Sequence, residues 1–224
     1  MVRRLFQWFA VASLAALAHA APAAYAVPLT TLTSGGTLTC GDKYFNAFTY
    51  LATGNMPTTS GVNVVCITDN GNHGIRVQGG FGDLPGGGPS DALLTYTVSV
   101  VGTSQLISDA HITGNPEVVP HVGGAGAVAV SDTWSEFPGA TISIYKINPP
   151  GFTHASDAIL FPHPVPALHA QKDIFAFAEN GLAYLSFIDQ TYSQTSVPEP
   201  GTLGLLGIGL LGLAGYSRRR LRQH

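Results

Sequence analysis

The sequence predicts an all-β fold: a single β-sandwich or jelly-roll-like domain between an N-terminal signal peptide and a short C-terminal transmembrane helix. Between residues 27 and 196 no long segment has the 3.6-residue periodicity of an amphipathic helix. Short runs rich in Val, Ile, Thr, Tyr and Phe instead alternate with clusters of Gly, Pro, Asn and Asp, the pattern of strands and turns. Each end of the chain carries an apolar run beside arginines.

The strands are predicted from alternation of apolar and polar residues and from the turns that bound them. The clearest alternation covers 94–100, and the others are expected at 63–68, 74–81, 106–113, 126–130, 141–147, 173–178 and 182–188. The last two are predicted to form a hairpin, because Asn180-Gly181 is a favoured turn pair. Phe45, Phe48 and Tyr50 are expected to pack in the core.

The N-terminus is typical of a secretory signal, with Arg3 and Arg4 before an apolar core at 5–18. Two small-x-small sites place signal peptidase cleavage either between Ala26 and Val27 or between Ala20 and Ala21, and the sequence does not separate them. A permanent membrane anchor is the alternative, but no stop-transfer charges follow the apolar core. We therefore assign 1–26 to the signal peptide.

The exported body, residues 27–196, is long enough for one domain with a substantial core. Its 12 acidic residues against four basic ones give a net charge of −8, whereas the whole chain carries −3. An acidic surface repels phosphate backbones, so nucleic acid is not expected as a partner.

Cys40 and Cys66 are the only cysteines, and both lie in the body. In an oxidising compartment such a pair usually forms a disulfide. A buried free pair and half of a metal site are the alternatives, but no neighbouring Cys or His cluster favours a metal.

No pattern in the body predicts a catalytic, metal or cofactor site. The glycine-rich stretch 79–90 lacks the Lys and the helix of a phosphate-binding loop, so a surface loop is expected. Asp69, Asn70 and Asn72 favour a turn over a calcium loop. Asp132 and Glu136 could form a glycosidase pair but are interpreted as unpaired surface acids. The remaining candidates are body histidines without metal-ligand spacing, interpreted as surface or packing residues: His73, His111, His121, His154, His163 and His169. The last two lie among Pro162, Pro164 and Pro166, which predict an irregular loop there.

The tail, residues 197–224, has three parts in a fixed order. The first part is the motif formed by Val197, Pro198, Glu199 and Pro200, and the second is an uncharged glycine-rich span at 202–216. Fifteen residues reach roughly 23 Å as a helix, short of a bilayer core of about 30 Å. The third part is a cluster that the positive-inside rule keeps in the cytoplasm: Arg218, Arg219, Arg220 and Arg222.

This order of parts resembles the PEP-CTERM sorting signal of exported bacterial proteins. The resemblance implies a Gram-negative-type bacterium and an exosortase that recognises Pro198-Glu199-Pro200 and removes the span, so the chain is membrane-inserted at least transiently. An ordinary tail anchor with a proline-rich stalk is the alternative. Segments 35–45, 90–98 and 188–195 also resemble a recurrent body type among PEP-CTERM proteins, for which no enzymatic activity is implied.

We therefore expect a non-enzymatic exported protein, sorted through its tail to the cell envelope, cell surface or extracellular matrix and associated with exopolysaccharide or biofilm. Signal peptidase and exosortase are its expected processing partners, and an extracellular polysaccharide is a further candidate partner. The alternative is a surface-displayed carbohydrate-binding or carbohydrate-cleaving β-sandwich.

Overall fold

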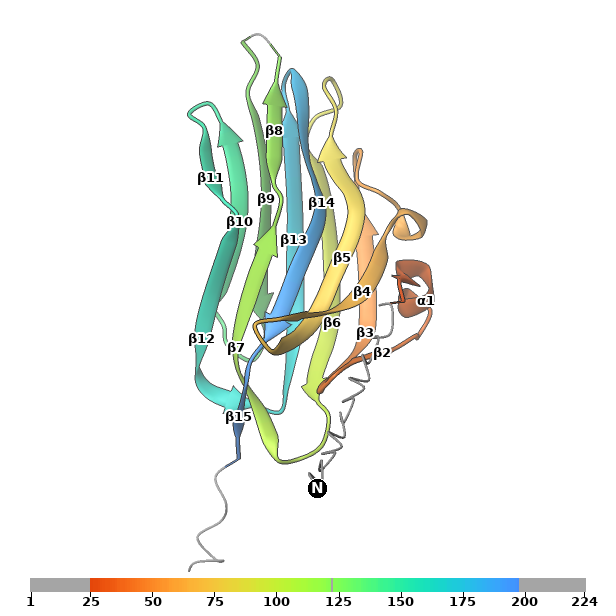
Figure 1. Cartoon of the computed structure of the whole chain (residues 1–224). Helices are drawn as coiled ribbons and strands as arrows, with labels where there is room; N and C mark the ends of the chain where they lie inside the picture. The colour runs from red at the N-terminus through yellow and green to blue at the C-terminus, as the bar shows by residue number, and fades with distance from the viewer. Residues whose placement is uncertain (1–24, 122, 198–224) are drawn as a thin grey trace, which may run out of the picture.

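The protein is a sandwich of two antiparallel β-sheets, as the sequence predicted (Figure 1). The computed structural model describes residues 25–121 and 123–197. Two short helices, α1 (Leu29–Thr33) and the 3₁₀ helix η1 (Thr59–Gly61), lie at one side of the sandwich. Leu29 and Leu32 of α1 are fully buried, so this helix closes one edge of the core.

The eight strands of sheet A include six that form a continuous path. In spatial order they are β1 (Val27–Pro28), β4 (Asn63–Asp69), β5 (Asn72–Asp83), β14 (Gly181–Tyr192), β7 (Gln105–Gly114) and β12 (Ser156–Val165). Two shorter strands lie beside this path: β8 (Glu117–Pro120) pairs with β14, and β15 (Gln194–Ser196) pairs with β7.

Sheet B has seven strands. In spatial order they are β11 (Phe152–His154), β10 (Thr141–Asn148), β9 (Gly126–Trp134), β13 (Ala167–Ala178), β6 (Ser90–Val100), β3 (Lys43–Ala52) and β2 (Leu38–Cys40). The chain passes from one sheet to the other at most connections after β3, so the two sheets wrap one core in a jelly-roll-like manner.

The core lies between the inner faces of the sheets, and the period-2 pattern of the strands builds it. On β6, Leu94, Tyr96 and Val98 are buried while the residues between them are more exposed, as the alternation predicted. Phe45 and Phe48 are both buried although an odd spacing would place them on opposite faces. A register shift between Asn46 and Thr49, with Ala47 at φ 54°, turns both rings inward.

The predicted hairpin around Asn180-Gly181 is wrong. Strand β13 pairs with β6 and β9 in sheet B, whereas β14 pairs with β5, β7 and β8 in sheet A. The turn therefore joins the two layers and not two neighbours of one sheet. An Asn-Gly pair reverses the chain in either case, so local turn chemistry could not distinguish the two.

Strand β12 was not predicted, because Pro162, Pro164 and Pro166 suggested an irregular loop. The strand lies at the edge of sheet A, where β7 is its one neighbour among the described strands, and its register shifts between Leu160 and Val165. Prolines are tolerated on an edge strand because their missing N–H is not needed by a second neighbour.

The glycine-rich segment is shorter as a loop than predicted, because residues 79–83 belong to β5. Buried Asp83 fastens the loop at its start: its carboxylate accepts hydrogen bonds from Ser90 Oγ at 2.6 Å and from the Ala178 N–H at 2.9 Å. By contrast, the turn at 69–72 is confirmed, with Asn70 and Gly71 both at positive φ between β4 and β5.

The predicted disulfide is confirmed: Cys40 and Cys66 are bonded, with their Cα atoms 5.2 Å apart. Cys40 ends β2 of sheet B and Cys66 lies in β4 of sheet A, so the bond clamps the two layers together near the edge that α1 closes.

No helix within residues 25–121 and 123–197 is long and apolar enough to cross a membrane. The predicted signal peptide, apart from its last two residues, and the predicted span at 202–216 lie outside the described residues.

Removing the disulfide is expected to lower the free energy of unfolding. The bond closes a loop across a separation of 26 residues, so the double variant Cys40→Ala/Cys66→Ala should lose about 3–4 kcal/mol in the chain-entropy model. Urea unfolding at equilibrium measures the loss. Reductant should destabilise the wild type to a similar degree and leave the variant unchanged; equal stability of the oxidised wild type and the variant would contradict the prediction.

Candidate functional site

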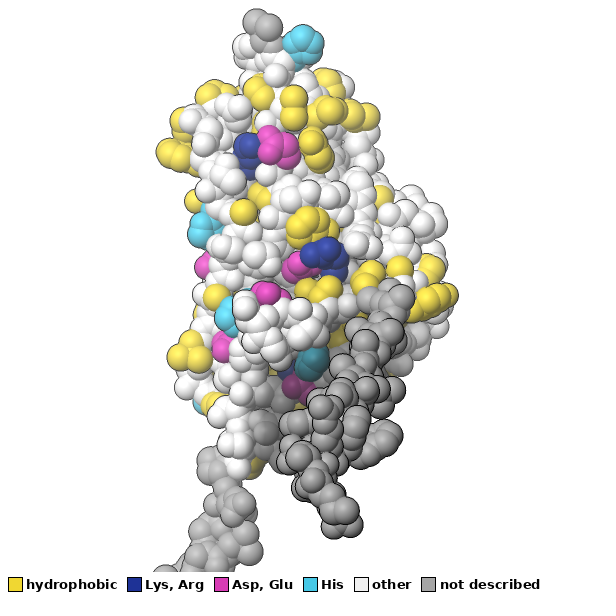
Figure 2. Space-filling model, viewed as in Figure 1, with side chains coloured by type: hydrophobic (Ala, Val, Ile, Leu, Met, Phe, Trp, Pro, Cys, Tyr) yellow, Lys and Arg dark blue, Asp and Glu magenta, His cyan; other side chains and the backbone are white. Residues whose placement is uncertain are grey.

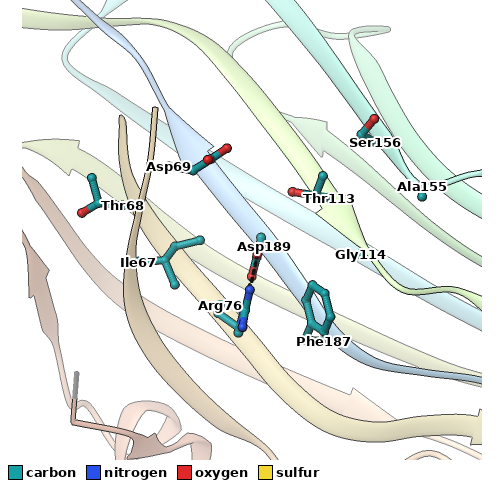
Figure 3. A pocket seen from close by; sticks show the side chains of 10 residues that line it. All are labelled: Ile67, Thr68, Asp69, Arg76, Thr113, Gly114, Ala155, Ser156, Phe187 and Asp189. Atoms are coloured by element: carbon teal, nitrogen blue, oxygen red, sulfur yellow. Dashed lines mark hydrogen bonds and ion pairs between the residues drawn. The ribbon is translucent and has the colours of Figure 1, made fainter. Parts of the chain in front are cut away.

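An open groove crosses the outer face of sheet A (Figure 3). Its volume is about 650 Å³, and strands β4, β5, β7 and β14 form it together with the start of β12. The side chains and backbone that line it are those of Ile67, Thr68, Asp69, Arg76, Thr113, Gly114, Ala155, Ser156, Phe187 and Asp189. Around it, this face of the molecule shows few charged side chains, and hydrophobic ones gather at its upper end (Figure 2).

An ion pair lies at the centre of the groove. Arg76 on β5 and Asp189 on β14 are directly opposite in register, so their side chains leave the same face side by side. Arg76 Nε and Nη2 donate to the two carboxylate oxygens of Asp189 at 2.6 and 2.7 Å. These hydrogen bonds raise the pKa of Arg76 further above its usual value. The two hydrogen bonds thus hold the guanidinium in one orientation.

The ring of Phe187 completes this arrangement, because the guanidinium carbon of Arg76 lies 4.3 Å from the ring centroid. Such a cation–π contact contributes on the order of 0.5–1 kcal/mol at an exposed site. Phe187 and Asp189 are two residues apart on β14, so both face outward and both contact the Arg76 side chain.

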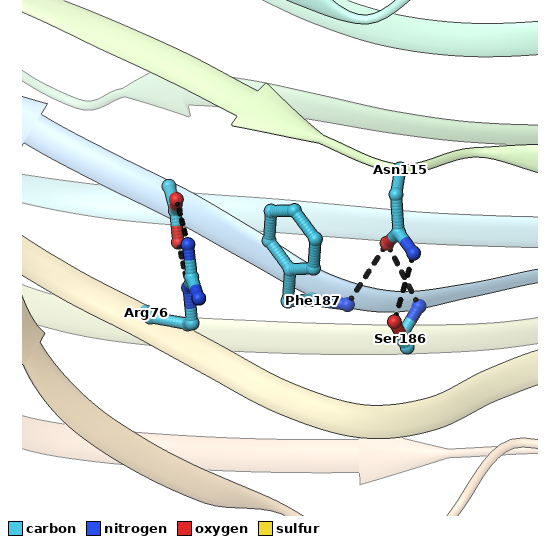
Figure 4. A network of polar contacts seen from close by, with 5 residues as sticks. Arg76, Asn115, Ser186 and Phe187 are labelled. Atoms are coloured by element: carbon cyan, nitrogen blue, oxygen red, sulfur yellow. Dashed lines mark hydrogen bonds and ion pairs between the residues drawn. The ribbon is translucent and has the colours of Figure 1, made fainter.

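Phe187 reaches the outer face because β14 bulges on the side of β7 and β8. Between Tyr184 and Ile188, β14 has three residues where the facing chain between Glu117 and Gly114 has two, so Ser186 and Phe187 lie where a regular strand would place one residue. Figure 4 shows Asn115 beside these two residues. Asn115 binds the bulge: its Oδ1 accepts from the N–H groups of Ser186 and Phe187 at 3.0 and 3.2 Å. Its Nδ2 donates to Ser186 Oγ at 2.8 Å.

Gly114 brings β7 close enough to the bulge for Asn115 to reach it. A Cβ at this position would lie 3.0 Å from the carbonyl oxygen of Phe187 and 2.5 Å from Ile144 Cδ1. Both distances are shorter than an ordinary contact, so a larger residue would require β7 to move by a few tenths of an ångström from β14 and the end of the Ile144 side chain to shift. The groove therefore depends on a close approach of two backbones.

Chemically, the groove offers an aromatic edge, a fixed planar cation–carboxylate pair and several hydroxyl groups. Thr68, Thr113 and Ser156 supply the hydroxyls from three different strands. This combination suits reversible contact with a flat, hydroxylated ligand, because the ring can pack against its face while the polar groups exchange hydrogen bonds with it.

The interpretation of Asp132 and Glu136 as unpaired surface acids is wrong for both residues. Asp132 is 1% exposed and contacts Lys172 in the core. Glu136 accepts hydrogen bonds from the His169 backbone N–H at 2.9 Å and from its Nδ1. Burial raises the pKa of Glu136, but the hydrogen bonds from His169 outweigh this and lower it. A glycosidase pair is also not supported, because one member is sealed between the sheets.

The histidines are packing or surface residues, as expected. His154 stacks on Tyr145, and His163 packs edge-on against Phe137. His163 and His169 lie in strands β12 and β13 and not in the irregular loop that was predicted. Among the described residues, no group of three or more His, Cys, Asp or Glu side chains could hold a metal ion.

The tail joins the body at the end of β15. Val197, the first residue of the predicted sorting motif, donates its N–H to the Ser104 carbonyl at 3.0 Å. The described residues end at Val197 and do not include the rest of the predicted sorting signal, which comprises Pro198, Glu199, Pro200 and the arginine cluster 218–222. The body is thus fastened by hydrogen bonds up to the residue before Pro198.

At the other end, Val27 pairs with Val64 in the two-residue strand β1, and Ala26 precedes it without regular structure. Cleavage between Ala26 and Val27 would leave this strand intact. The alternative site, Ala20 and Ala21, lies outside the described residues, so both cleavage positions remain predictions.

Sequence reasoning missed the groove. Arg76 and Asp189 are 113 residues apart, and no local spacing connects them. The one usable signal was composition: Arg76 is the sole arginine between residues 27 and 196, in a body that is otherwise strongly acidic. Asn115 carried no signal, because its function depends on a bulge in a different strand.

The sequence matches the family model described as the PEP-CTERM protein-sorting motif over residues 196–220. The resemblance predicted for the tail is therefore confirmed, and the motif marks an exported protein with transient membrane anchoring. No curated protein matches the chain.

Two solved structures are similar to it. One is the enzymatically active domain of tailspike protein 4 of bacteriophage CBA120, with 14% identity over 65% of this chain and a TM-score of 0.29. The chain spans only 19% of that domain's length. The other is TmCBM61 in complex with beta-1,4-galactotriose, with 10% identity over 64% of this chain and 88% of that one, and a TM-score of 0.29. Neither likeness is strong enough to bear on function.

Truncating Asn115 is expected to weaken the bulge that presents Phe187. Asn115→Ala removes the acceptor for two backbone N–H groups, which should lower the free energy of unfolding by about 1–2 kcal/mol. Ser186→Ala is the matched control, since it removes only the side-chain hydrogen bond and should cost clearly less. Urea denaturation compares the two; an equal effect of both variants would contradict the account of the bulge.

Proposed function

We propose that this protein is a non-enzymatic exported β-sandwich, delivered by its PEP-CTERM tail to the cell surface or extracellular matrix and processed by an exosortase. The observation that carries the proposal is the sorting motif at residues 196–220, which begins where the described part of the body makes its final backbone hydrogen bonds, at Ser196 and Val197. In this proposal the tail directs the sorting of the protein, and the body is the part that is delivered.

The junction supports removal of the tail. Strand β15 ends at Ser196 and Val197 still bonds to Ser104, so cleavage beyond Val197 removes no described strand. The acidic body, with a net charge of −8 over residues 27–196, is suited to a hydrated extracellular environment. We extend the proposal to an association with exopolysaccharide or biofilm, which the resemblance of the tail implies.

Deleting residues 198–224 is expected to abolish surface or matrix delivery without unfolding the body. The measurement is cell fractionation and immunodetection of the chain expressed in a bacterium that has an exosortase. Glu199→Ala should cause the same loss of processing, while Thr202→Ala, a change within the matched segment but outside Val197–Pro200, should be processed normally. The proposal fails if the deletion leaves both localisation and processing unchanged.

The groove on sheet A favours a second candidate function, a carbohydrate-binding domain displayed by the same tail. The specific observation is the fixed Arg76–Asp189 pair beside Phe187, with hydroxyl groups around it. A fold alone does not confer this function, so the groove must be tested directly.

A glycan screen of the mature protein, with calcium and with a chelator, distinguishes the two functions. The first proposal, in which the association with exopolysaccharide involves no defined binding site on the body, expects no saturable binding. The second expects saturable binding whose Kd rises at least about tenfold in Phe187→Ala, a loss of about 1.4 kcal/mol. Tyr184→Ala is the matched control, since Tyr184 is an exposed aromatic on the same strand that does not line the groove. Saturable binding would overturn the purely structural role.

A further inference from the structure

A lysine and an aspartate lie fully buried between the two sheets. Lys172 on β13 and Asp132 on β9 are directly opposite in the register of sheet B, and both side chains point into the sandwich. Their exposed side-chain fractions are 0% and 1%. Lys172 Nζ lies 2.6 Å from each of the two carboxylate oxygens of Asp132. The amine is therefore held against the carboxyl group by two neighbouring strands.

Sheet A covers this pair from the opposite side. Gln190 on β14 accepts a hydrogen bond from Lys172 Nζ at 3.0 Å through its Oε1. The Gln190 Nε2 group is buried and has no hydrogen-bond partner among the described residues. Tyr96 and Tyr192, whose hydroxyls are 2.9 Å apart, are both buried close enough for the Asp132 charge to raise their pKa values. The site is thus enclosed by side chains from both layers.

Burial acts on the two groups in opposite directions. It lowers the pKa of Lys172 and raises the pKa of Asp132, and the attraction between the two charges only partly offsets this. A buried ion pair gains little over a neutral pair, because removing both charges from water costs about as much as their attraction returns. The pair therefore has access to its neutral form, an amine beside a carboxylic acid, by transfer of one proton.

We propose that Lys172 and Asp132 are joined by an intramolecular amide bond. The Lys172 amine attacks the carboxyl carbon of Asp132, a C–N bond forms, the C–OH bond breaks, and one water leaves with a proton from the nitrogen. No oxidant, metal or cofactor is needed, since an amine and an acid balance to an amide and water. The carboxyl group needs no separate activation, because the amine is held against it. Well-oriented neighbouring groups react as though their concentration were about 10⁵–10⁸ M.

Gln190 is the positioning residue of this step. Its Oε1 accepts one hydrogen of the amine, which fixes the orientation of the nitrogen next to the carboxyl group. Its Nε2 has no hydrogen-bond partner among the described residues and so does not reach the Asp132 carboxylate, and the positioning role of Gln190 therefore rests on its Oε1 contact with the amine.

The product would reinforce the sandwich where the disulfide does not. The bond between Cys40 and Cys66 clamps one edge, whereas Lys172 and Asp132 lie on two adjacent strands within sheet B and are 40 residues apart in sequence. An amide is not reduced by thiols, so it would persist outside the cell under all redox conditions. This property fits an exported domain.

The test is the mass of the purified full-length chain after reduction of the disulfide. The cross-linked protein is about 18 Da lighter than its residues require, the mass of one water. Tandem mass spectrometry of a digest should locate the loss in a branched peptide that contains both Asp132 and Lys172. A full mass, with both side chains recovered unmodified, overturns the proposal.

Two variants separate the cross-link from dehydration elsewhere. Lys172→Arg keeps the charge but carries no amine that can form this amide, and Asp132→Ala removes the carboxyl group, so both should regain the full mass. Persistence of the 18 Da loss in either variant would also overturn the proposal. Gln190→Leu should slow the appearance of the loss in freshly made protein at least about tenfold, which a merely structural residue would not do.

Discussion

Burial of one face of each sheet against the other is the constraint on which the rest of this structure depends. It fixes the inward residues of β6, the bulge that turns both Phe45 and Phe48 inward, and the closure of the edge by α1. The same constraint makes the Lys172–Asp132 contact exceptional, because it places two ionisable side chains in an interior closed to water. The side chains on the outer faces of the sheets are not under this constraint, and the groove around Arg76 is formed by such outward-facing side chains.

The fold was predictable from the sequence wherever the signal was local. Alternation at 94–100 and the turn at Asn70-Gly71 both depend on neighbouring residues, and both are confirmed. The hairpin at Asn180-Gly181 was not predictable, because a turn does not specify which sheet the next strand joins. Asp132 was misassigned for a related reason: its burial follows from the register of β9 with β13, which no spacing along the chain reveals.

The candidate sites divide in the same way. The sorting motif is a contiguous segment read by another protein, so its residues could be identified in order. The groove combines residues from five strands, and its geometry depends jointly on the bulge in β14, on Gly114 and on Asn115. This contrast also describes the proposed division of labour, in which the tail determines where the protein goes and the body provides a sealed, doubly fastened domain that survives there.

The most direct test of the central claim is the intact mass of the mature protein recovered from the bacterium that makes it. The account predicts a chain that begins at Val27 or at Ala21 and that lacks the span at 202–216 together with Arg218–Arg222. Such a mass would establish the tail as a temporary address. A mature mass that still contains the arginine cluster would contradict the account and indicate a permanently anchored protein.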